Sequence, residues 1–116
     1  MHEFSLCRAV AAIAEEHAQG RPVTVVRINV GHFRQVVPAT MVRCWELLVP
    51  DTALEGSQLM IREVPAVIDC SVCGARTPLT VPVHLCGSCG GTATRLVSGD
   101  EFIVDSIDIA PVPEEV

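Results

Sequence analysis

The decisive stretch of this sequence reads CSVCG at residues 70–74 and CGSCG at residues 86–90. Its two Cys-x-x-Cys pairs are formed by Cys70, Cys73, Cys86 and Cys89, and twelve residues separate the pairs. A structural Zn²⁺ site requires four thiolates that converge on one centre at about 2.3 Å. A glycine follows each pair, at a point where the turn needs a residue that tolerates a positive φ. The pattern therefore predicts a structural zinc site without an open coordination position.

Three other uses of these cysteines are compatible with their spacing. They could form two disulfides, act as a dithiol redox centre, or hold iron as in rubredoxin. One Cys-x-x-Cys pair would suffice for redox chemistry, and a reducing compartment disfavours disulfides. Spacing alone leaves iron open, but zinc is the interpretation that we favour.

Composition limits the classes of function. The chain has 116 residues, a formal net charge of −6 and no lysine, and this balance disfavours nucleic-acid binding. Hydrophobic residues make up 49% of the sequence and aromatic residues 3%, so the core must be aliphatic. No apolar run reaches the roughly 18 residues of a membrane span, and the N-terminus lacks the pattern of a signal peptide. We expect a cytoplasmic protein without a membrane or nucleic-acid partner.

The hydrophobic periodicity predicts two helices and three strands. Residues 4–18 form an apolar stripe at helical spacing, and a second helix begins at Pro38 and ends before Pro50. Residues 23–30, 59–68 and 101–109 form extended segments. The helix between the first two strands suggests a parallel crossover. We predict an α+β fold, with a small mixed three-stranded sheet covered by two helices and an inserted Cys₄ zinc-binding module.

The same reading divides the chain into three segments. Residues 1–68 form the first part of an α/β domain, residues 69–97 form the zinc-binding module, and residues 98–116 return as the last strand and a tail. The module is rich in Gly, Pro and Thr and poor in core residues, so it needs its metal to fold. Cys7 and Cys44 lie in helical apolar patterns, and we interpret them as small buried hydrophobic residues.

No catalytic pattern is present in the sequence, which lacks a nucleophile elbow, a phosphate-binding loop and a Ser/His/Asp arrangement. We therefore expect that the protein is not an enzyme. The remaining candidate is the start of the chain, Met1-His2-Glu3. Its α-amine, backbone amides and imidazole could form fused chelate rings around Ni²⁺ or Cu²⁺, which accept such nitrogen ligands in square-planar geometry. Taken alone, this is a weak signal.

The full pattern resembles the HypA/HybF family of hydrogenase maturation proteins. The similarity rests on Met-His-Glu-Phe-Ser-Leu at residues 1–6, Val-Gly at residues 30–31, Val-Val-Pro-Ala at residues 36–39, and the cysteine quartet. It covers essentially the whole chain. The N-terminal triplet and the quartet are its most specific parts, and neither would suffice without the other.

This resemblance implies a nickel metallochaperone that binds Ni(II) as transient cargo at Met1, His2 and Glu3, with His2 indispensable. It implies that Cys70, Cys73, Cys86 and Cys89 hold structural Zn(II). The implied partners are a nickel-binding GTPase maturation factor, the large subunit of [NiFe]-hydrogenase and, in some organisms, urease maturation proteins. The nickel-binding domain would then be residues 1–68 with residues 98–116.

The chain departs from the family pattern at two places. Some members have an acidic residue near the start of the second helix that can complete the nickel site, whereas residues 36–40 contain no acid here. Some members have a histidine directly after a Cys-x-x-Cys pair, whereas Gly74 and Gly90 occupy these positions here. A carboxylate ligand from the second helix and a pH-responsive zinc site are therefore not expected.

Two other functions remain as alternatives. The first is a zinc-ribbon-like interaction adaptor without a nickel role, which would bind zinc and no specific nickel. The second is a thiol oxidoreductase that uses the Cys-x-x-Cys pairs, which tightly bound zinc would argue against. Metal analysis of the purified protein distinguishes both from a nickel carrier.

Overall fold

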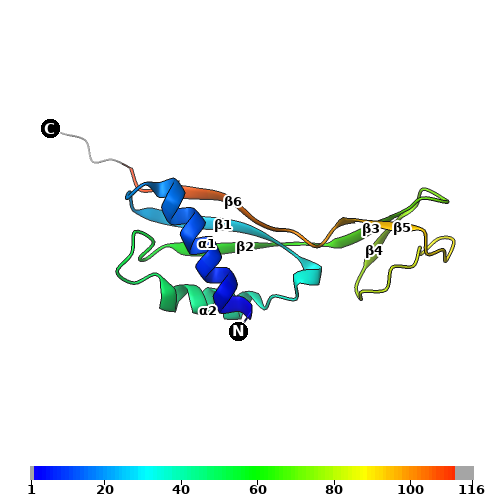
Figure 1. Ribbon diagram of the computed structural model, residues 1–116, viewed down its shortest axis with the longest axis horizontal. Helices are drawn as coiled ribbons and strands as arrows, with labels where there is room; N and C mark the ends of the chain where they lie inside the picture. The colour runs from blue at the N-terminus through cyan, green and yellow to red at the C-terminus, as the bar shows by residue number, and fades with distance from the viewer. Residues whose placement is uncertain (1, 112–116) are drawn as a thin grey trace. The chain divides into compact units, whose positions relative to one another are not determined.

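The two helices and six strands of the computed structural model are shown in Figure 1, and the structure describes residues 2–111. In chain order the elements are α1 (His2–Ala18), β1 (Val23–Gly31), the short 3-10 helix η1 (His32–Arg34), α2 (Pro38–Leu48), β2 (Gln58–Val64), β3 (Ala66–Cys70), β4 (Arg76–Leu79), β5 (Thr94–Ser98) and β6 (Phe102–Ile109). The described residues form two compact units. Unit 1 comprises residues 2–28, 36–61 and 103–111, and unit 2 comprises residues 29–35 and 62–102.

Unit 1 is built on a three-stranded sheet with the order β2-β1-β6. β1 and β2 run in the same direction and β6 runs in the opposite direction, so the sheet is mixed (Figure 1). The antiparallel pairing of β1 with β6 is also seen in the bond from the Ala110 N–H to the Pro22 carbonyl, 2.8 Å, and from Thr24 Oγ1 to the Asp108 carbonyl. The predicted α+β class, with a mixed sheet, two helices and an inserted cysteine module, is confirmed.

The core of unit 1 lies between the two helices and one face of the sheet. Val26 and Ile28 point from β1 into this core and are fully buried. The two helices pack on each other, and the Cys7 thiol of α1 donates a hydrogen bond to the Met41 carbonyl of α2 at 3.3 Å. Both cysteines outside the quartet are buried, as predicted. Ile13, an apolar residue within the helix expected at residues 4–18, is 41% exposed.

Unit 2 contains a second sheet with the order β4-β3-β5, in which β3 pairs antiparallel with both neighbours. On β3, Asp69 lies opposite Arg76 of β4 and Arg95 of β5. Its carboxylate forms ion pairs with both guanidinium groups, at 2.9 Å and 3.7 Å. This sheet holds the first cysteine turn, because Cys70 is the last residue of β3.

Two expectations about the strands need correction. We expected one extended segment over residues 59–68 with an edge or bend at Pro65, but the segment forms two strands that separate at Pro65, β2 in the first sheet and β3 in the second. Proline lacks the N–H that a continuing strand would need for its ladder. The strands β4 and β5 were not expected at all, because their sequences contain Pro, Thr and Ser rather than a long apolar alternation.

Three backbone segments of unit 2 meet at a point without room for side chains. A Cβ on Gly31 would lie 2.2 Å from the carbonyl carbon of Gly99, and a Cβ on Gly99 would lie 2.5 Å from Cα of Ala66. Two hydrogen bonds fasten this crossing, from the Gly31 N–H to the Glu101 carbonyl at 2.7 Å and from the Phe33 N–H to the Gly99 carbonyl at 2.8 Å. Glycine is therefore required at residues 31 and 99.

Among residues 2–111, no helix is both long enough and apolar enough to pass through a lipid bilayer.

Candidate metal centre

The two Cys-x-x-Cys turns have the same backbone geometry. In the first, the Gly74 N–H bonds the Cys70 carbonyl at 3.0 Å, and in the second the Gly90 N–H bonds the Cys86 carbonyl at 2.9 Å. Both glycines have a positive φ, 76° and 71°, with no atom near the position of a Cβ. The prediction that each turn needs a residue of positive φ is confirmed. Each turn therefore folds back so that its two sulfurs lie on one side.

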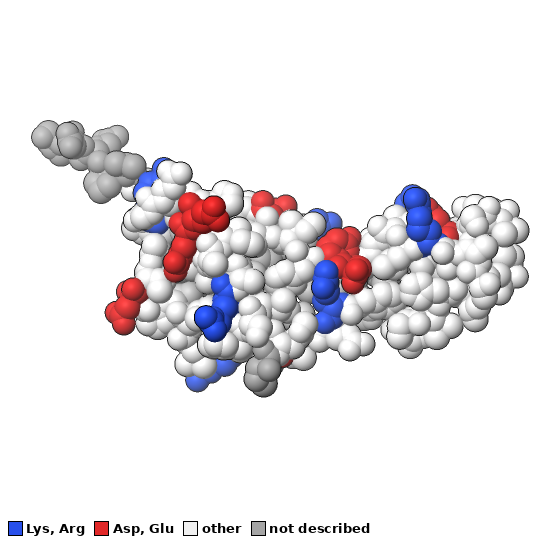
Figure 2. All heavy atoms as spheres, in the orientation of Figure 1, with Lys and Arg blue, Asp and Glu red and all other residues white. Residues whose placement is uncertain are grey.

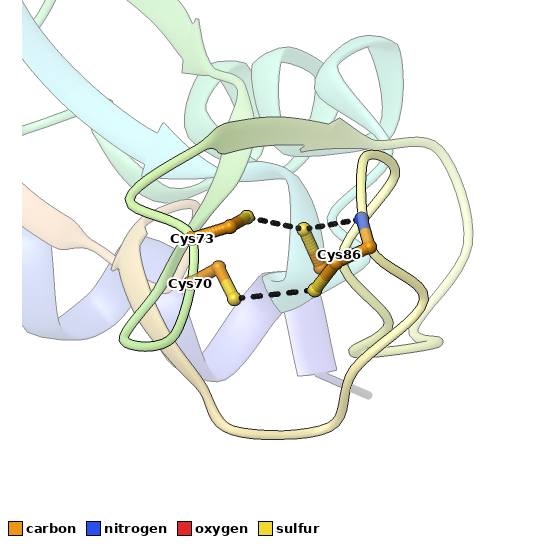
Figure 3. Close-up of side chains that lie close together, drawn as sticks. Cys70, Cys73 and Cys86 are labelled. Carbon is orange, nitrogen blue, oxygen red and sulfur yellow. Dashed lines mark hydrogen bonds between the residues drawn. The ribbon is translucent and has the colours of Figure 1, made fainter.

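The four sulfurs of the quartet converge on one point. Figure 3 shows Cys70 and Cys73 on one loop directed toward Cys86 on the facing loop. Cys73 Sγ lies 3.5 Å from Cys86 Sγ, and Cys70 Sγ lies 3.7 Å from Cys89 Sγ. All four sulfurs lie within 4.8 Å of one another. A tetrahedron with metal–sulfur distances of about 2.3 Å has edges of about 3.8 Å, so the arrangement fits Zn²⁺.

Backbone amides stabilise the thiolate form of two cysteines. The N–H groups of Cys89 and Ser88 both lie 3.4 Å from Cys86 Sγ, and they lower the pKa of that thiol to about 6. The amides three and two residues after Cys70 lower the pKa of Cys70 in the same way. A thiol that is easily deprotonated is a ready metal ligand, because the metal binds the thiolate.

Cys89 shows the opposite shift. The Gly91 N–H at 3.4 Å favours its thiolate, but the neighbouring thiols of Cys70 and Cys86 outweigh this bond and raise the pKa of Cys89 to about 11. Four thiolates this close repel one another, so a proton on Cys89 relieves the repulsion. A dication at the centre would take the place of that proton, and this too fits a zinc site.

The surroundings of the quartet carry almost no charge. Residues 77–94 contain no Asp, Glu, Lys or Arg, and on the face drawn in Figure 2 the cysteine end of unit 2 is correspondingly white. Cys73 and Cys89 are exposed, whereas Cys70 and Cys86 are buried. His84 is exposed, as expected of a loop histidine, and its ring lies 5.9 Å from that of Phe33. A metal ion held by all four sulfurs would have a complete tetrahedral shell and no open position for a substrate.

Two residues that support the second cysteine turn escaped the sequence reading. Thr77 Oγ1 of β4 accepts a hydrogen bond from the Gly87 N–H at 2.9 Å and so ties this turn to the sheet. Phe33 lies in η1, far from the quartet in sequence, and contacts His84. A threonine or a phenylalanine at these positions does not indicate, from a single sequence, that it contacts the cysteine turn.

The predicted nickel ligands lie at the start of unit 1. Met1 is outside the described residues, whereas His2 and Glu3 form the first turn of α1, with His2 exposed and Glu3 half-buried. The first turn of α2 contains no acidic residue. Within residues 2–111, the cysteine quartet is the only cluster of three or more His, Cys, Asp or Glu residues whose ligand atoms lie close enough to hold a metal.

A comparison with known proteins agrees with the sequence resemblance. The model of a protein family described as "Hydrogenase/urease nickel incorporation, metallochaperone, hypA" matches residues 1–109. The chain is 37% identical over 109 residues to the "Hydrogenase maturation factor HypA" of Geobacter metallireducens, covering 94% of this chain and 99% of that protein. It is 40% identical over 114 residues to the protein of the same name from Chlorobium phaeobacteroides, covering 94% and 99%.

Two solved structures are similar in fold. The first is the "Solution structure of the Ni metallochaperone HypA from Helicobacter pylori", with a TM-score of 0.66 and 19% identity over 94% of this chain and 97% of the other. The second is the "Solution structure of HypA protein", with a TM-score of 0.69 and 21% identity over 95% and 97%. At these identities the structures show a shared fold.

Proposed function

The chain belongs to the HypA family of hydrogenase and urease nickel-incorporation metallochaperones, and we propose that it binds Ni(II) through Met1, His2 and Glu3. The ion is cargo that is handed on, and no catalytic residue is assigned. The observation that supports the proposal is that α1 begins at His2, so that His2 and Glu3 belong to the first turn of a helix.

The start of a helix suits this kind of ligation. The first four N–H groups of an α-helix have no partner within the helix, so the amides of His2 and Glu3 can lose their protons without breaking a helical hydrogen bond. Nitrogen ligands of this kind favour Ni²⁺ in a planar arrangement. Because the imidazole and the α-amine must also be deprotonated, nickel affinity should fall as the pH is lowered.

The same position should keep the affinity low enough for release. A cation at a helix N-terminus opposes the helix dipole by about 0.3–1 kcal/mol. The first turn of α2 adds no carboxylate, since residues 38–40 are Pro, Ala and Thr. Glu3 is the acidic residue in the first turn of α1, and it contributes its backbone nitrogen or a carboxylate oxygen.

We assign structural Zn(II) to Cys70, Cys73, Cys86 and Cys89. Their convergence and the lowered thiol pKa of both Cys70 and Cys86 support this assignment. When bound, zinc would link the two turns and fix the loop between them, which has little core of its own. Because four thiolates complete a tetrahedral site, we do not expect this position to exchange nickel.

The partners follow from the family. We propose that the protein works in the cytoplasm with a nickel-binding GTPase maturation factor and delivers nickel to the large subunit of [NiFe]-hydrogenase. The family description names urease beside hydrogenase, so urease maturation proteins are a second destination.

Calorimetric titration of Ni²⁺ into the untagged, zinc-loaded protein tests the nickel site. We expect specific binding that is lost in His2→Ala and in a variant with one extra residue before Met1, with the zinc content unchanged. His17→Ala is the matched control, because His17 is also an exposed histidine on α1. Equal nickel affinity in the wild type and His2→Ala would refute the site, and bound zinc without specific nickel would favour an adaptor.

A further inference from the structure

We propose that the groove between the end of α2 and the start of β2 is a docking site for a cationic, partly apolar peptide segment of a partner protein. The groove has a volume of about 600 Å³ and lies entirely within unit 1. Its apolar lining comes from Val42, Trp45, Val49, Pro50 and Leu59. The proposal goes beyond the nickel site, because the groove contains none of the proposed nickel ligands.

The floor of the groove is preorganised. Trp45 is 1% exposed, and its indole N–H donates a hydrogen bond to Ser57 Oγ at 2.9 Å, which ties α2 to the loop before β2. That loop is held by its own hydrogen bonds, from Thr52 Oγ1 to the Val49 carbonyl at 2.7 Å and from the Ser57 N–H to the Leu54 carbonyl at 2.9 Å. A rigid surface loses little entropy when a peptide binds.

The charge around the groove selects the occupant. Glu46 and Glu55 line it, and both are exposed. The last turn of α2, whose carbonyl groups carry partial negative charge, contains no basic residue. Arg43 lies 3.4 Å from Glu46, but both side chains are largely exposed and such pairs are weak. Two carboxylates and an unbalanced helix C-terminus therefore favour a Lys or Arg side chain flanking an apolar one.

The location of the groove would leave the proposed nickel ligands accessible. α2 has eleven residues and spans about 16 Å at 1.5 Å per residue. The Cys7–Met41 hydrogen bond places the first turns of α1 next to the start of α2, whereas the groove is lined from Val42, in the middle of α2, to the residues that follow the helix. A partner could thus be held at one end of α2 while the metal is handed over at the other.

The single tryptophan of the chain provides the measurement. Trp45 forms part of the buried floor of the groove and the sequence has no tyrosine, so a change in its fluorescence reports a change in the environment of the groove. We would titrate the zinc-loaded protein with the peptide acetyl-Lys-Leu-Lys-Leu-amide and, separately, with acetyl-Glu-Leu-Glu-Leu-amide. We expect a saturable change of Trp45 emission with the cationic peptide and none with the acidic peptide.

A pair of double variants tests the role of the groove carboxylates. Glu46→Gln with Glu55→Gln should weaken binding of the cationic peptide about tenfold. Glu16→Gln with Asp105→Asn removes the same amount of charge from exposed positions outside the groove and should change the affinity less than about twofold. All four side chains are exposed, so both variants should fold.

Three outcomes would overturn the proposal: no saturable response, equal binding of the two peptides, or equal weakening in the two double variants. The experiment involves no nickel, so its failure is distinguishable from failure of the nickel site. Loss of nickel binding in His2→Ala should leave peptide binding intact.

Discussion

The two units of this protein are stabilised by different means. Unit 1 buries an aliphatic core between two helices and a sheet, whereas unit 2 contributes only Val30, Ala66, Ile68, Cys70 and Cys86 to the buried apolar residues of the described chain. Unit 2 has instead the two cysteine turns and the cross-strand ion pairs of Asp69, which are weak because both arginine side chains are largely exposed. A core of that size is small for independent stability, and a bound metal can replace the missing core.

The units also differ in charge. Unit 2 has four arginines and four acidic residues, whereas the described residues of unit 1 have four arginines and eight acidic residues. Glu114 and Glu115, outside the described residues, supply the other two negative charges of the chain. A unit without net charge is suited to contacts that change little with salt, whereas an acidic unit attracts cations and basic partners. The exchangeable metal and the charged docking surface that we propose would then belong to one unit, and the proposed permanent metal to the other.

Loss of the proposed zinc should have the largest effect, because it should unfold unit 2 and leave unit 1 folded. Cys73→Ser removes one thiolate, and structural zinc sites contribute about 10 kcal/mol or more to folding. We expect the amide resonances of residues 62–102 to lose their dispersion in NMR spectra while α1 and α2 remain helical. Cys44→Ser is the control. Cys44 is buried in unit 1 and is not a proposed zinc ligand, so this variant should keep its bound zinc. Collapse of both units in Cys73→Ser would contradict independent stabilisation.

Damage to the core of unit 1 should have the next largest effect. Ile28→Ala deletes a fully buried side chain from β1 and should lower the free energy of unfolding by about 2–5 kcal/mol. Trp45 fluorescence in a denaturant titration measures this loss. Zinc content should stay at the wild-type value, and a parallel loss of zinc would show that the units are coupled.

A methyl group added at the backbone crossing should lower the free energy of unfolding somewhat less than Ile28→Ala does. In Gly31→Ala the new Cβ meets Gly99, and overpacking of this kind costs about 1–3 kcal/mol or more. Gly56→Ala is the matched control: Gly56 has φ +75° and open space around it, so only the backbone preference is lost. Thermal unfolding should show a larger drop in Tm for Gly31→Ala, and an equal drop would mean that the crossing relaxes easily.

The smallest effect concerns an ion pair on the sheet of unit 1. Arg27 donates two hydrogen bonds to the Asp108 carboxylate, at 2.8 and 2.9 Å, and holds the pKa of Asp108 below its usual 3.8. This stabilisation is present above pH 3.8 and disappears as the pH falls through the lowered pKa. Asp108→Asn should therefore flatten the acid dependence of unit 1 stability slightly, and less so at high salt. An unchanged acid profile would mean that the pair contributes nothing.

Features that depend on local chemistry could be predicted from the sequence. The cysteine turns follow from residue spacing and from the glycines at 74 and 90, and α2 follows from Pro38 and its apolar face. The nickel assignment came from family resemblance, since Met-His-Glu at a chain start is weak evidence by itself. It remains a proposal here.

Features that depend on tertiary pairing could not be predicted. β4 and β5 exist because they pair with β3, and their short, polar sequences give no periodic signal. The groove at Trp45 is formed by residues from α2, a loop and β2, and its shape depends on the hydrogen bond to Ser57. A single sequence does not show which residues close such a surface.

The crossing at Gly31 also limits how this protein can be recombined with its relatives. The unit that carries the cysteines is not one continuous stretch, because residues 29–35 belong to it and supply Phe33 beside His84 and the Gly31 bond to Glu101. A chimera that exchanges only residues 62–102 would combine a new cysteine unit with an old support segment. Grafting should therefore succeed when both segments come from the same parent, and inheritance of the unit should be traceable as two separated blocks of sequence.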